Sequence, residues 1–282
     1  MSEAEIDLMQ DYINQRVHHR KPLQYILGTQ PFLDLEILVR PPTLIPRWET
    51  EEWTGRLARL TRPRVVSNKS EEDIGSRSKS GSKSSAGWFN ILDICTGSGC
   101  IPLGLASALP ESSCRLTGID IHDLAIQLAR ENEATNRRLL NNNPVQFHQA
   151  DLFHPEAVSM FLNWQRTSFD LVVSNPPYIA HSEQPELEPE VSKWEDPKAL
   201  MADEEGLVFY PKIAHMAMKL LKTKTRRNSP IVDRVEAPEI VLEIGGDHQA
   251  DAVTASVREA GFTRVEVWKD LADRARCVVG SR

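Results

Sequence analysis

Alternation of short apolar strands with longer helical segments is the feature that most constrains the fold of this chain. Helical stretches with apolar residues three and four positions apart separate the strands. This order predicts an α/β fold with a doubly wound, mostly parallel sheet. Two later apolar runs, 263–268 and 275–279, predict a closing antiparallel pair and bring the sheet to seven strands. The five earlier strands are expected near Ile91, Leu116, Val145, Leu171 and Ile240.

Polar residues stand at or near the carboxyl ends of four predicted strands. They are Asp93, Asp120, Asp151 and Asn175. In open α/β sheets, ligands bind in the crevice beyond the carboxyl ends of the strands. We therefore expect these four side chains to converge on one crevice.

The tetrapeptide Asn175-Pro176-Pro177-Tyr178 directly follows the apolar run 169–174. Each proline fixes its own φ and lacks an N–H, and a residue before proline favours extended backbone, so no helix continues here. The Asn175 side-chain oxygen and the Pro176 carbonyl offer two acceptors for the two N–H bonds of a planar NH2 group. Tyr178 would stack on that plane. These four residues are the predicted catalytic set; a proline-rich turn with a buried tyrosine is the alternative interpretation.

The strand near Ile91 runs into a glycine turn, 95–99, and then into a helix predicted over 101–109. Glycines permit φ > 0 and let a ligand approach the backbone, and the helix start offers free N–H groups. The next strand ends at Asp120, where the ribose of a nucleoside cofactor would present its hydroxyls. A helix N-cap is the alternative role for Asp120. Pro102 stands where a dinucleotide-binding motif has its third glycine, which argues against a nicotinamide dehydrogenase.

Glycine turn, acidic strand end and Asn-Pro-Pro-Tyr, in that order, resemble the class I S-adenosylmethionine-dependent methyltransferases. The resemblance implies that fold and S-adenosyl-L-methionine as the cofactor. It also implies that Asp151 accepts from the adenine amino group and that Leu152 or Phe153 lines the ring, with a capping role as the alternative for Asp151. The implied cofactor-binding residues are Asp93, Cys95, Thr96, Gly97, Ser98, Gly99, Asp120, Asp151, Leu152 and Asn175.

The segments 22–28 and 44–51, with Phe32 between them, resemble the linker of the HemK family of peptide chain release factor N5-glutamine methyltransferases. The segments 242–245 and 269–271 are also similar to that family. The resemblance implies methylation of the glutamine side-chain amide in the Gly-Gly-Gln loop of a class I release factor. Adenine-N6 DNA methyltransferases share Asn-Pro-Pro-Tyr but not the linker. A nucleic-acid amino-methyltransferase and a non-catalytic cofactor-binding scaffold stay open as alternatives.

Three positions depart from the family pattern. Cys95 replaces the first glycine of the turn, so its backbone needs φ < 0 or tolerates strain. Trp48 stands where the family has proline, and Leu152 stands where some members carry an aromatic residue. The cofactor site is therefore expected to differ in detail from that of the family.

The amino-acid composition limits the classes of binding partner that we expect. The net charge of -7 disfavours duplex DNA, because affinity for phosphates rests on clustered Lys and Arg, and it favours a protein substrate. No apolar run approaches the roughly eighteen residues of a membrane span. The four cysteines show no paired spacing, so we expect neither a metal site nor a disulfide framework, and core thiols in a reducing compartment.

Three regions are expected along the chain. Residues 1–60 form an N-terminal helix and a linker hairpin, shorter than the substrate-docking domain of bacterial members; 61–87 form a disordered insertion; and 88–282 form the catalytic domain. The basic stretch 222–235 is interpreted as a solvated loop, with contact to RNA or an acidic partner as the alternative. Family analogy suggests mitochondria, although no import sequence is visible in this chain, and the cytoplasm is the alternative.

Overall fold

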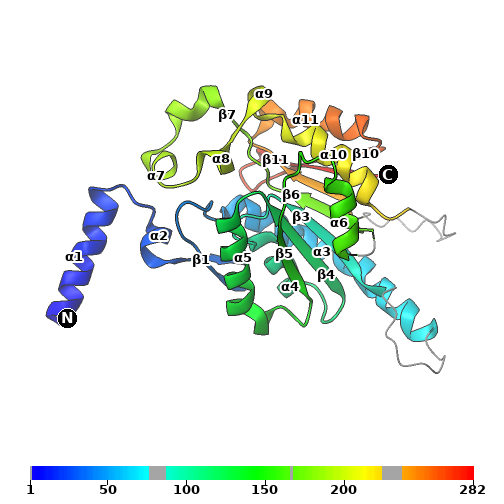
Figure 1. Ribbon diagram of the computed structural model, residues 1–282, viewed down its shortest axis with the longest axis horizontal. Coiled ribbons are helices and arrows are strands. Elements are labelled where there is room, and N and C mark those ends of the chain that lie inside the picture. Colours follow the sequence, from blue (N-terminus) through cyan, green and yellow to red (C-terminus); the bar gives the residue numbers. More distant parts are fainter. Residues whose placement is uncertain (1, 76–86, 166–167, 224–236) are drawn as a thin grey trace.

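A seven-stranded, mostly parallel sheet forms the centre of the protein (Figure 1). The computed structural model describes residues 2–75, 87–165, 168–223 and 237–282. The strand order is β10-β11-β9-β6-β3-β4-β5, and β11 runs antiparallel to both of its neighbours. This confirms the predicted fold and its C-terminal hairpin. The strands are β3 (Phe89–Ile94), β4 (Cys114–Asp120), β5 (Val145–Gln149), β6 (Leu171–Ser174), β9 (Ile240–Glu243), β10 (Arg264–Lys269) and β11 (Ala275–Ser281).

Helices cover both faces of the sheet because alternate strand side chains point to opposite sides. In β6, Leu171 and Val173 join the core beneath α3, α4 and α5, whereas Val172 joins the core beneath α6, α10 and α11. The helices are α3 (Trp48–Gly75), α4 (Cys100–Ala108), α5 (Asp123–Asn136), the 3-10 turn η2 (Arg137–Leu139), α6 (Ala157–Gln165), α10 (Phe209–Leu220) and α11 (Asp247–Glu259).

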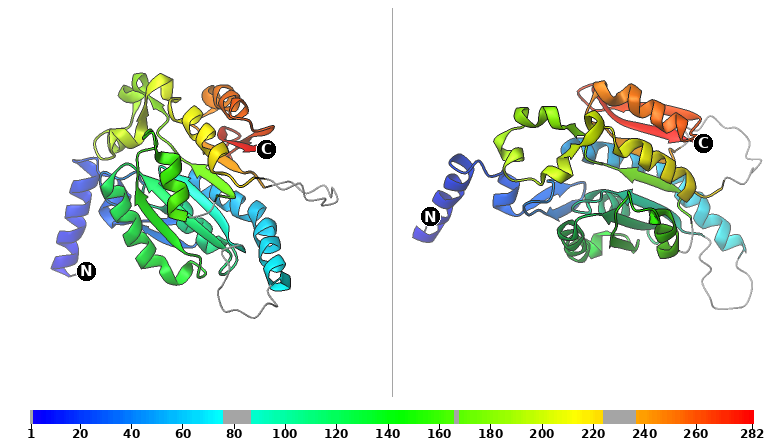
Figure 2. Two further views of the ribbon diagram at one scale, coloured as in Figure 1. Left: turned by 45° about the vertical axis from the view of Figure 1, so that its right-hand side comes forward. Right: turned by 45° about the horizontal axis from the view of Figure 1, so that its top comes forward.

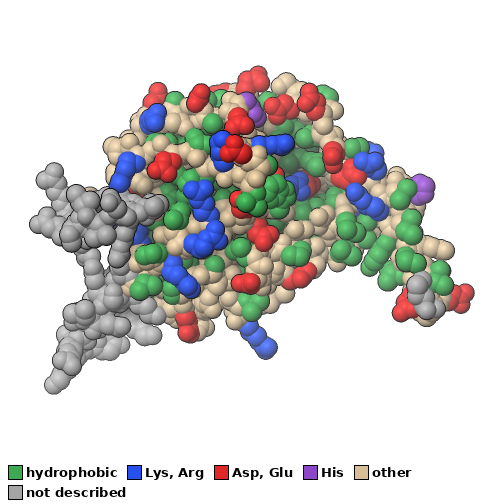
Figure 3. Space-filling view, turned by 180° about the vertical axis from the view of Figure 1, so that it is seen from behind, with side chains coloured by type: hydrophobic (Ala, Val, Ile, Leu, Met, Phe, Trp, Pro, Cys, Tyr) green, Lys and Arg blue, Asp and Glu red, His purple; other side chains and the backbone are tan. Residues whose placement is uncertain are grey.

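The N-terminal segment holds α1 (Glu3–Val17), α2 (Leu23–Leu27) and a hairpin of β1 (Thr29–Phe32) and β2 (Leu35–Leu38). Phe32 is fully buried in the core around α4, which anchors the hairpin to the body. Helix α1 projects away from the body in the right view of Figure 2, and none of its residues is buried. Its apolar side chains are exposed, as Figure 3 shows.

A segment of short elements joins β6 to α10 and lies over the carboxyl ends of the strands (Figure 1). It begins with the Asn-Pro-Pro-Tyr sequence. Strands β7 and β8 pair in parallel within it. Its elements are β7 (Ile179–Ala180), the 3-10 helix η3 (His181–Glu186), α7 (Pro189–Ser192), α8 (Pro197–Leu200), β8 (Met201–Ala202) and α9 (Asp203–Gly206).

The prediction that residues 61–87 form a disordered insertion is wrong for the first part of this range. Helix α3 runs on to Gly75, so residues 61–75 are helical. Leu57, Thr61 and Val65 are buried and four positions apart, and this spacing places them on one helix face against α4. The Ser- and Lys-rich composition masked that periodicity. Residues 76–86 lie outside the described residues.

The basic stretch 222–235 lies mostly outside the described residues. Lys222 is described, and its Nζ lies 2.5 Å from Asp170 Oδ2, so this charge has a partner within the chain. Among the described helices, none is both long and apolar enough to cross a membrane.

Candidate active site

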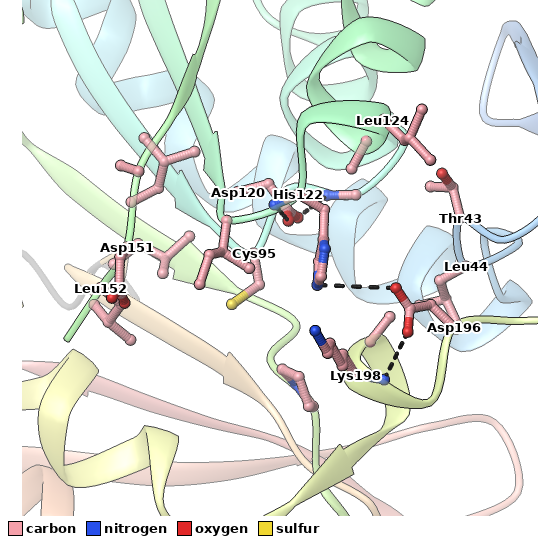
Figure 4. A pocket seen from close by; sticks show the side chains of 18 of the residues that line it. Thr43, Leu44, Cys95, Asp120, His122, Leu124, Asp151, Leu152, Asp196 and Lys198 are labelled. Carbon is pink, nitrogen blue, oxygen red and sulfur yellow. Dashed lines mark hydrogen bonds and ion pairs between the residues drawn. The ribbon is translucent and has the colours of Figure 1, made fainter. Parts of the chain in front are cut away.

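A cavity of about 260 Å³ lies at the carboxyl ends of the parallel strands. Each of four strands contributes a wall through the turn that follows it, and Figure 4 shows several of these residues around the cavity. Of the four polar residues that were expected to converge on one crevice, Asp120, Asp151 and Asn175 line this cavity, and Asp93 does not. The predicted residues that line the cavity are Cys95, Gly97, Asp120, Asp151, Leu152, Phe153, Asn175 and Pro177.

The glycine turn after β3 adopts left-handed backbone at three positions. Cys95 has φ 61°, Gly97 has φ 54° and Gly99 has φ 80°. Asp120 Oδ2 accepts from the Gly97 N–H at 2.9 Å, and its Oδ1 accepts from the His122 N–H at 2.9 Å. Asp120 therefore ties the turn to the end of β4, and the residue at the N-cap of α5 is His122.

Four predicted cofactor residues do not line the cavity, because Asp93, Thr96, Ser98 and Gly99 are buried. Asp93 Oδ2 accepts from the Thr96 hydroxyl at 2.6 Å. Its Oδ1 has no hydrogen-bond partner within the described chain, and burial raises the pKa of Asp93 to about 8. A Cβ on Gly99 would lie 2.8 Å from the Phe147 ring. These buried residues therefore shape the turn and not the surface of the cavity.

At one end of the cavity, polar and aromatic groups lie together. Asp151 is exposed, and its Oδ1 accepts from the Phe153 N–H at 2.8 Å, which gives it the local turn-capping role as well. Leu152 is buried, and the Phe153 ring meets Phe209 edge to face with centroids 5.4 Å apart. A flat apolar ring with a polar edge fits such surroundings.

The opposite wall comes from segments that the sequence did not connect with the strand ends. Thr43 and Leu44 come from the linker, and Asp196 and Lys198 come from the segment before and within α8. His122 Nε2 lies 3.9 Å from Asp196 across the cavity (Figure 4). Leu44 belongs to the linker motif, but no motif or spacing marked the other three.

A second cavity of about 140 Å³ adjoins the Asn-Pro-Pro-Tyr turn. Pro176 and Tyr178 line this cavity, together with Arg47 of the linker. Arg47 Nη2 lies 2.6 Å from the buried carboxylate of Glu195. Asn175 lines both cavities and therefore stands at their boundary.

Backbone contacts fix the turn that carries Tyr178. The Tyr178 N–H donates to the Leu200 carbonyl at 3.2 Å. The Gln249 amide donates from Nε2 to the Tyr178 carbonyl at 2.8 Å, and its Oε1 accepts from the Gly245 N–H at 2.8 Å. Gln249 is buried at the start of α11, and no sequence motif indicated it.

Comparison with known proteins identifies the family. A family described as a methyltransferase domain matches residues 88–226. A release factor glutamine methyltransferase of Thermodesulfovibrio yellowstonii is 35% identical over 260 residues, which cover 92% of this chain and 76% of that protein. The chain belongs to the release factor glutamine methyltransferase family.

Two further matches are a longer protein and a solved structure. A bifunctional methyltransferase of Rickettsia felis is 32% identical over 286 residues, which cover 100% of this chain and 49% of that protein. The chain thus spans about half the length of this relative. The solved structure titled "delta-N METTL16 MTase domain" has a TM-score of 0.52 at 15% identity and covers 98% of this chain and 95% of its own. That likeness concerns the fold alone.

S-adenosylmethionine is the methyl donor of this family, and the larger cavity fits it. The Asp120 carboxylate suits a ribose diol, and the wall around Leu152 and Phe153 suits an adenine ring. At Gly97, an added Cβ would meet nothing within 4 Å, so the turn leaves room for a ligand beside the backbone. Across the described ranges, no group of three or more His, Cys, Asp or Glu could hold a metal ion.

Two motif segments of the family meet behind Asn175. The Thr50 hydroxyl of α3 donates to Glu243 Oε2 at 2.8 Å, and the Trp53 indole donates to the same oxygen at 2.7 Å. Asn175 Nδ2 lies 3.3 Å from Thr50 Oγ1. Both segments are recognisable in the sequence, but nothing in the sequence gave Thr50 or Glu243 a role.

Proposed function

We propose that this chain methylates the side-chain amide nitrogen of a glutamine, the one in the Gly-Gly-Gln loop of a class I peptide chain release factor, and so acts in translation termination. Family membership supports the reaction and the substrate. The observation that carries the proposal is the position of Asn175 at the boundary of the two cavities. A methyl donor in the larger cavity and an amide in the smaller one would meet beside this side chain.

The smaller cavity suits an amide for chemical reasons. An amide nitrogen is a weak nucleophile because its lone pair is delocalised into the carbonyl. Asn175 Oδ1 and the Pro176 carbonyl would accept the two N–H bonds of the substrate NH2 group and stabilise positive charge that develops on nitrogen. Tyr178 would pack on the amide plane.

Positioning carries the catalysis in this arrangement. Among the described residues that line the smaller cavity there is no carboxylate, histidine or lysine to act as a general base. S-adenosylmethionine supplies an electrophilic methyl group when it is bound. The residues around Asn175 hold the amide nitrogen in near-attack geometry, and the nitrogen loses one proton to water after it has gained the methyl carbon.

The deciding experiment is methyl transfer from radiolabelled S-adenosylmethionine to a release factor with an intact Gly-Gly-Gln loop, compared with its Gln→Ala version. Label on the intact factor alone is the expected result, because the altered loop lacks the acceptor nitrogen. Label on both factors would place the acceptor elsewhere. Label on DNA or RNA but on neither factor would favour a nucleic-acid amino-methyltransferase, and bound cofactor without any transfer would favour a scaffold.

The compartment is a second proposal. We infer mitochondria from the resemblance of the linker segments 22–28 and 44–51 to the mitochondrial branch of the family. Expression of the full-length gene product with a C-terminal fluorescent tag, imaged beside a mitochondrial dye, tests it. Diffuse cytoplasmic fluorescence would contradict the assignment and leave the reaction untouched.

A further inference from the structure

We propose that Thr50 and Glu243 are positioning residues that determine which end of the Asn175 amide faces the methyl acceptor. They form a directed chain of hydrogen bonds from the carboxylate of β9, through a hydroxyl of α3, to the residue between the two cavities. The proposal deepens the proposed function, on which its kinetic part rests. Its spectroscopic part needs no methyl acceptor.

The direction of these hydrogen bonds follows from the number of protons that each group can donate. A hydroxyl has one proton to donate, and a carboxylate can only accept. Thr50 gives its proton to Glu243 Oε2 at 2.8 Å, so the Thr50 oxygen can only accept from Asn175. Asn175 Nδ2 lies at hydrogen-bonding distance from this oxygen, at 3.3 Å. The Asn175 NH2 group is therefore held toward Thr50.

This orientation leaves Asn175 Oδ1 for the methyl acceptor. An amide side chain has one accepting and one donating end, and the two ends look alike in shape. The reversed amide would place its own NH2 group against the NH2 group of the substrate, and two donors cannot bond. Because a reversed Asn175 would lose its acceptor, the hydrogen-bond chain controls whether the site can hold an amide substrate.

Burial strengthens the preference of these hydrogen bonds for one orientation of the Asn175 amide. Thr50 is 2% exposed, Glu243 is 1% exposed and Trp53 is 4% exposed, so water cannot readily replace a missing partner. The Trp53 indole is a donor only, and its bond to Glu243 Oε2 at 2.7 Å keeps that carboxylate in place. In such surroundings an unpaired polar group is costly, which disfavours the reversed amide further.

The hydrogen bonds keep this direction only while Glu243 is ionised. Burial raises the pKa of Glu243 to about 7, Glu49 also raises it, and Trp53, Thr50 and Arg276 lower it. From the other packed elements, Tyr178, Tyr210, Cys277 and Cys100 also face this carboxyl group. A protonated Glu243 can donate to Thr50, whose hydroxyl is then free to donate to Asn175 Oδ1. We therefore expect the competent orientation to be lost as the pH falls below about 7.

The same contacts would also exist if Glu243 only anchored α3 to β9. Four variants separate these roles: Thr50→Ser, Thr50→Val, Glu243→Gln and, as a matched control, Thr61→Val. Thr61 is a buried threonine of the same helix, and its hydroxyl has no hydrogen-bond partner within the described chain. Thr61→Val therefore makes the same change of shape without touching the chain of hydrogen bonds.

In methyl transfer to the release factor, Thr50→Val is expected to lower kcat roughly 10²-fold, because a misplaced catalytic group has an effect of this size. Thr50→Ser and Thr61→Val keep kcat near that of the wild type. Glu243→Gln lowers kcat and removes its pH dependence around 7. Calorimetric binding of S-adenosylmethionine is unchanged in all four. Wild-type kcat in Thr50→Val, or an equal loss in Thr61→Val, overturns the proposal.

The second readout is the side-chain NH2 signal of Asn175 in a 15N-labelled protein, assigned by its loss in Asn175→Ala. In the wild type this signal is expected to move with pH around 7, and in Glu243→Gln it is expected to stay still. A signal that does not respond to pH in the wild type overturns the proposal. If the wild type methylates no release factor, the proposed function fails, but this titration still decides on the positioning role.

Discussion

Asn175 lines both cavities, so it is the residue on which the proposed methyl transfer depends most directly. We expect Asn175→Ala to lower the methyl-transfer rate by about 10²- to 10³-fold, the usual effect of losing one preorganised hydrogen-bonding group. The alanine still leaves the cavity walls formed by Asp120 and Leu152, so cofactor affinity stays within the same order of magnitude. Single-turnover transfer and calorimetry measure the two quantities. An undiminished rate would remove Asn175 from the mechanism.

Cys95 shows strain at the scale of one residue. Its φ of 61° lies in the left-handed region, which costs a non-glycine residue about 1–2 kcal/mol. Of the two alternatives expected for Cys95, φ < 0 or tolerated strain, the structure therefore shows tolerated strain. Burial and the nearby carboxylates of Asp120 and Asp93 raise the pKa of the Cys95 thiol, which keeps it protonated and unreactive.

This strain gives a prediction with two arms. Cys95→Gly relieves the strain but adds chain entropy on unfolding, so the free energy of unfolding should stay within about 1 kcal/mol of the wild type. Cys95→Val places a β-branched side chain at the same φ and should lower that free energy by about 2 kcal/mol. Urea denaturation measures both. Equal stability of the two variants would contradict the argument from φ.

At the scale of elements, α9 and α11 hold the turn that carries Tyr178. A Cβ on Gly206 of α9 would lie 2.1 Å from the Tyr178 carbonyl oxygen and 2.7 Å from Gln249 Nε2. Gly206 therefore allows the hydrogen bond from Gln249 to that carbonyl. A close approach of three segments that are distant in the sequence therefore positions the turn that carries Tyr178.

Gly206→Ala should consequently lower methyl transfer as well as stability, because the turn must move. Gly28→Ala is the matched control: Gly28 has φ 84°, close to the φ of 82° at Gly206, but nothing lies within 4 Å of its added Cβ. The control should lose only the backbone cost of about 1–2 kcal/mol and retain its rate. Urea denaturation and initial rates test the pair. Similar rates in the two variants would show that the close approach does not matter for activity.

At the scale of the whole molecule, buried carboxyl groups link stability to pH. The pKa of Asp93 is raised to about 8 and that of Glu243 to about 7, in both cases chiefly by burial. The folded state thus holds protons that the unfolded chain releases near pH 4, so the contribution of these groups to stability is lost as the pH rises from about 4 to about 8.

We expect the free energy of unfolding to fall across this range by at most about 1.4 kcal/mol per pH unit for each retained proton. Asp93→Asn should flatten the profile because it removes one titrating group. Asp251→Asn changes an exposed carboxylate of α11 and should leave the profile as it is. Urea denaturation at several pH values measures all three proteins. An unchanged slope in Asp93→Asn would contradict a raised pKa at that position.

Much of the fold could be predicted because its signals are local. The strand at Leu171 and the proline turn at Asn175 are each encoded within a few residues, by apolar periodicity and by the fixed φ of proline. Composition misled at Thr61, where a Ser- and Lys-rich stretch continues α3. A helix can extend through such a stretch when a few residues four positions apart pack against a neighbouring helix.

By itself, the sequence determined the positions of the strands along the chain, the glycine turn and the Asn-Pro-Pro-Tyr turn, because each is a property of neighbouring residues. Only the tertiary structure decided which groups meet around them. Thr50 with Glu243, and Gln249 with Tyr178, come from segments far apart in the chain. Their pairing depends on how α3 and α11 pack on the sheet, and no local pattern of residues contains that information.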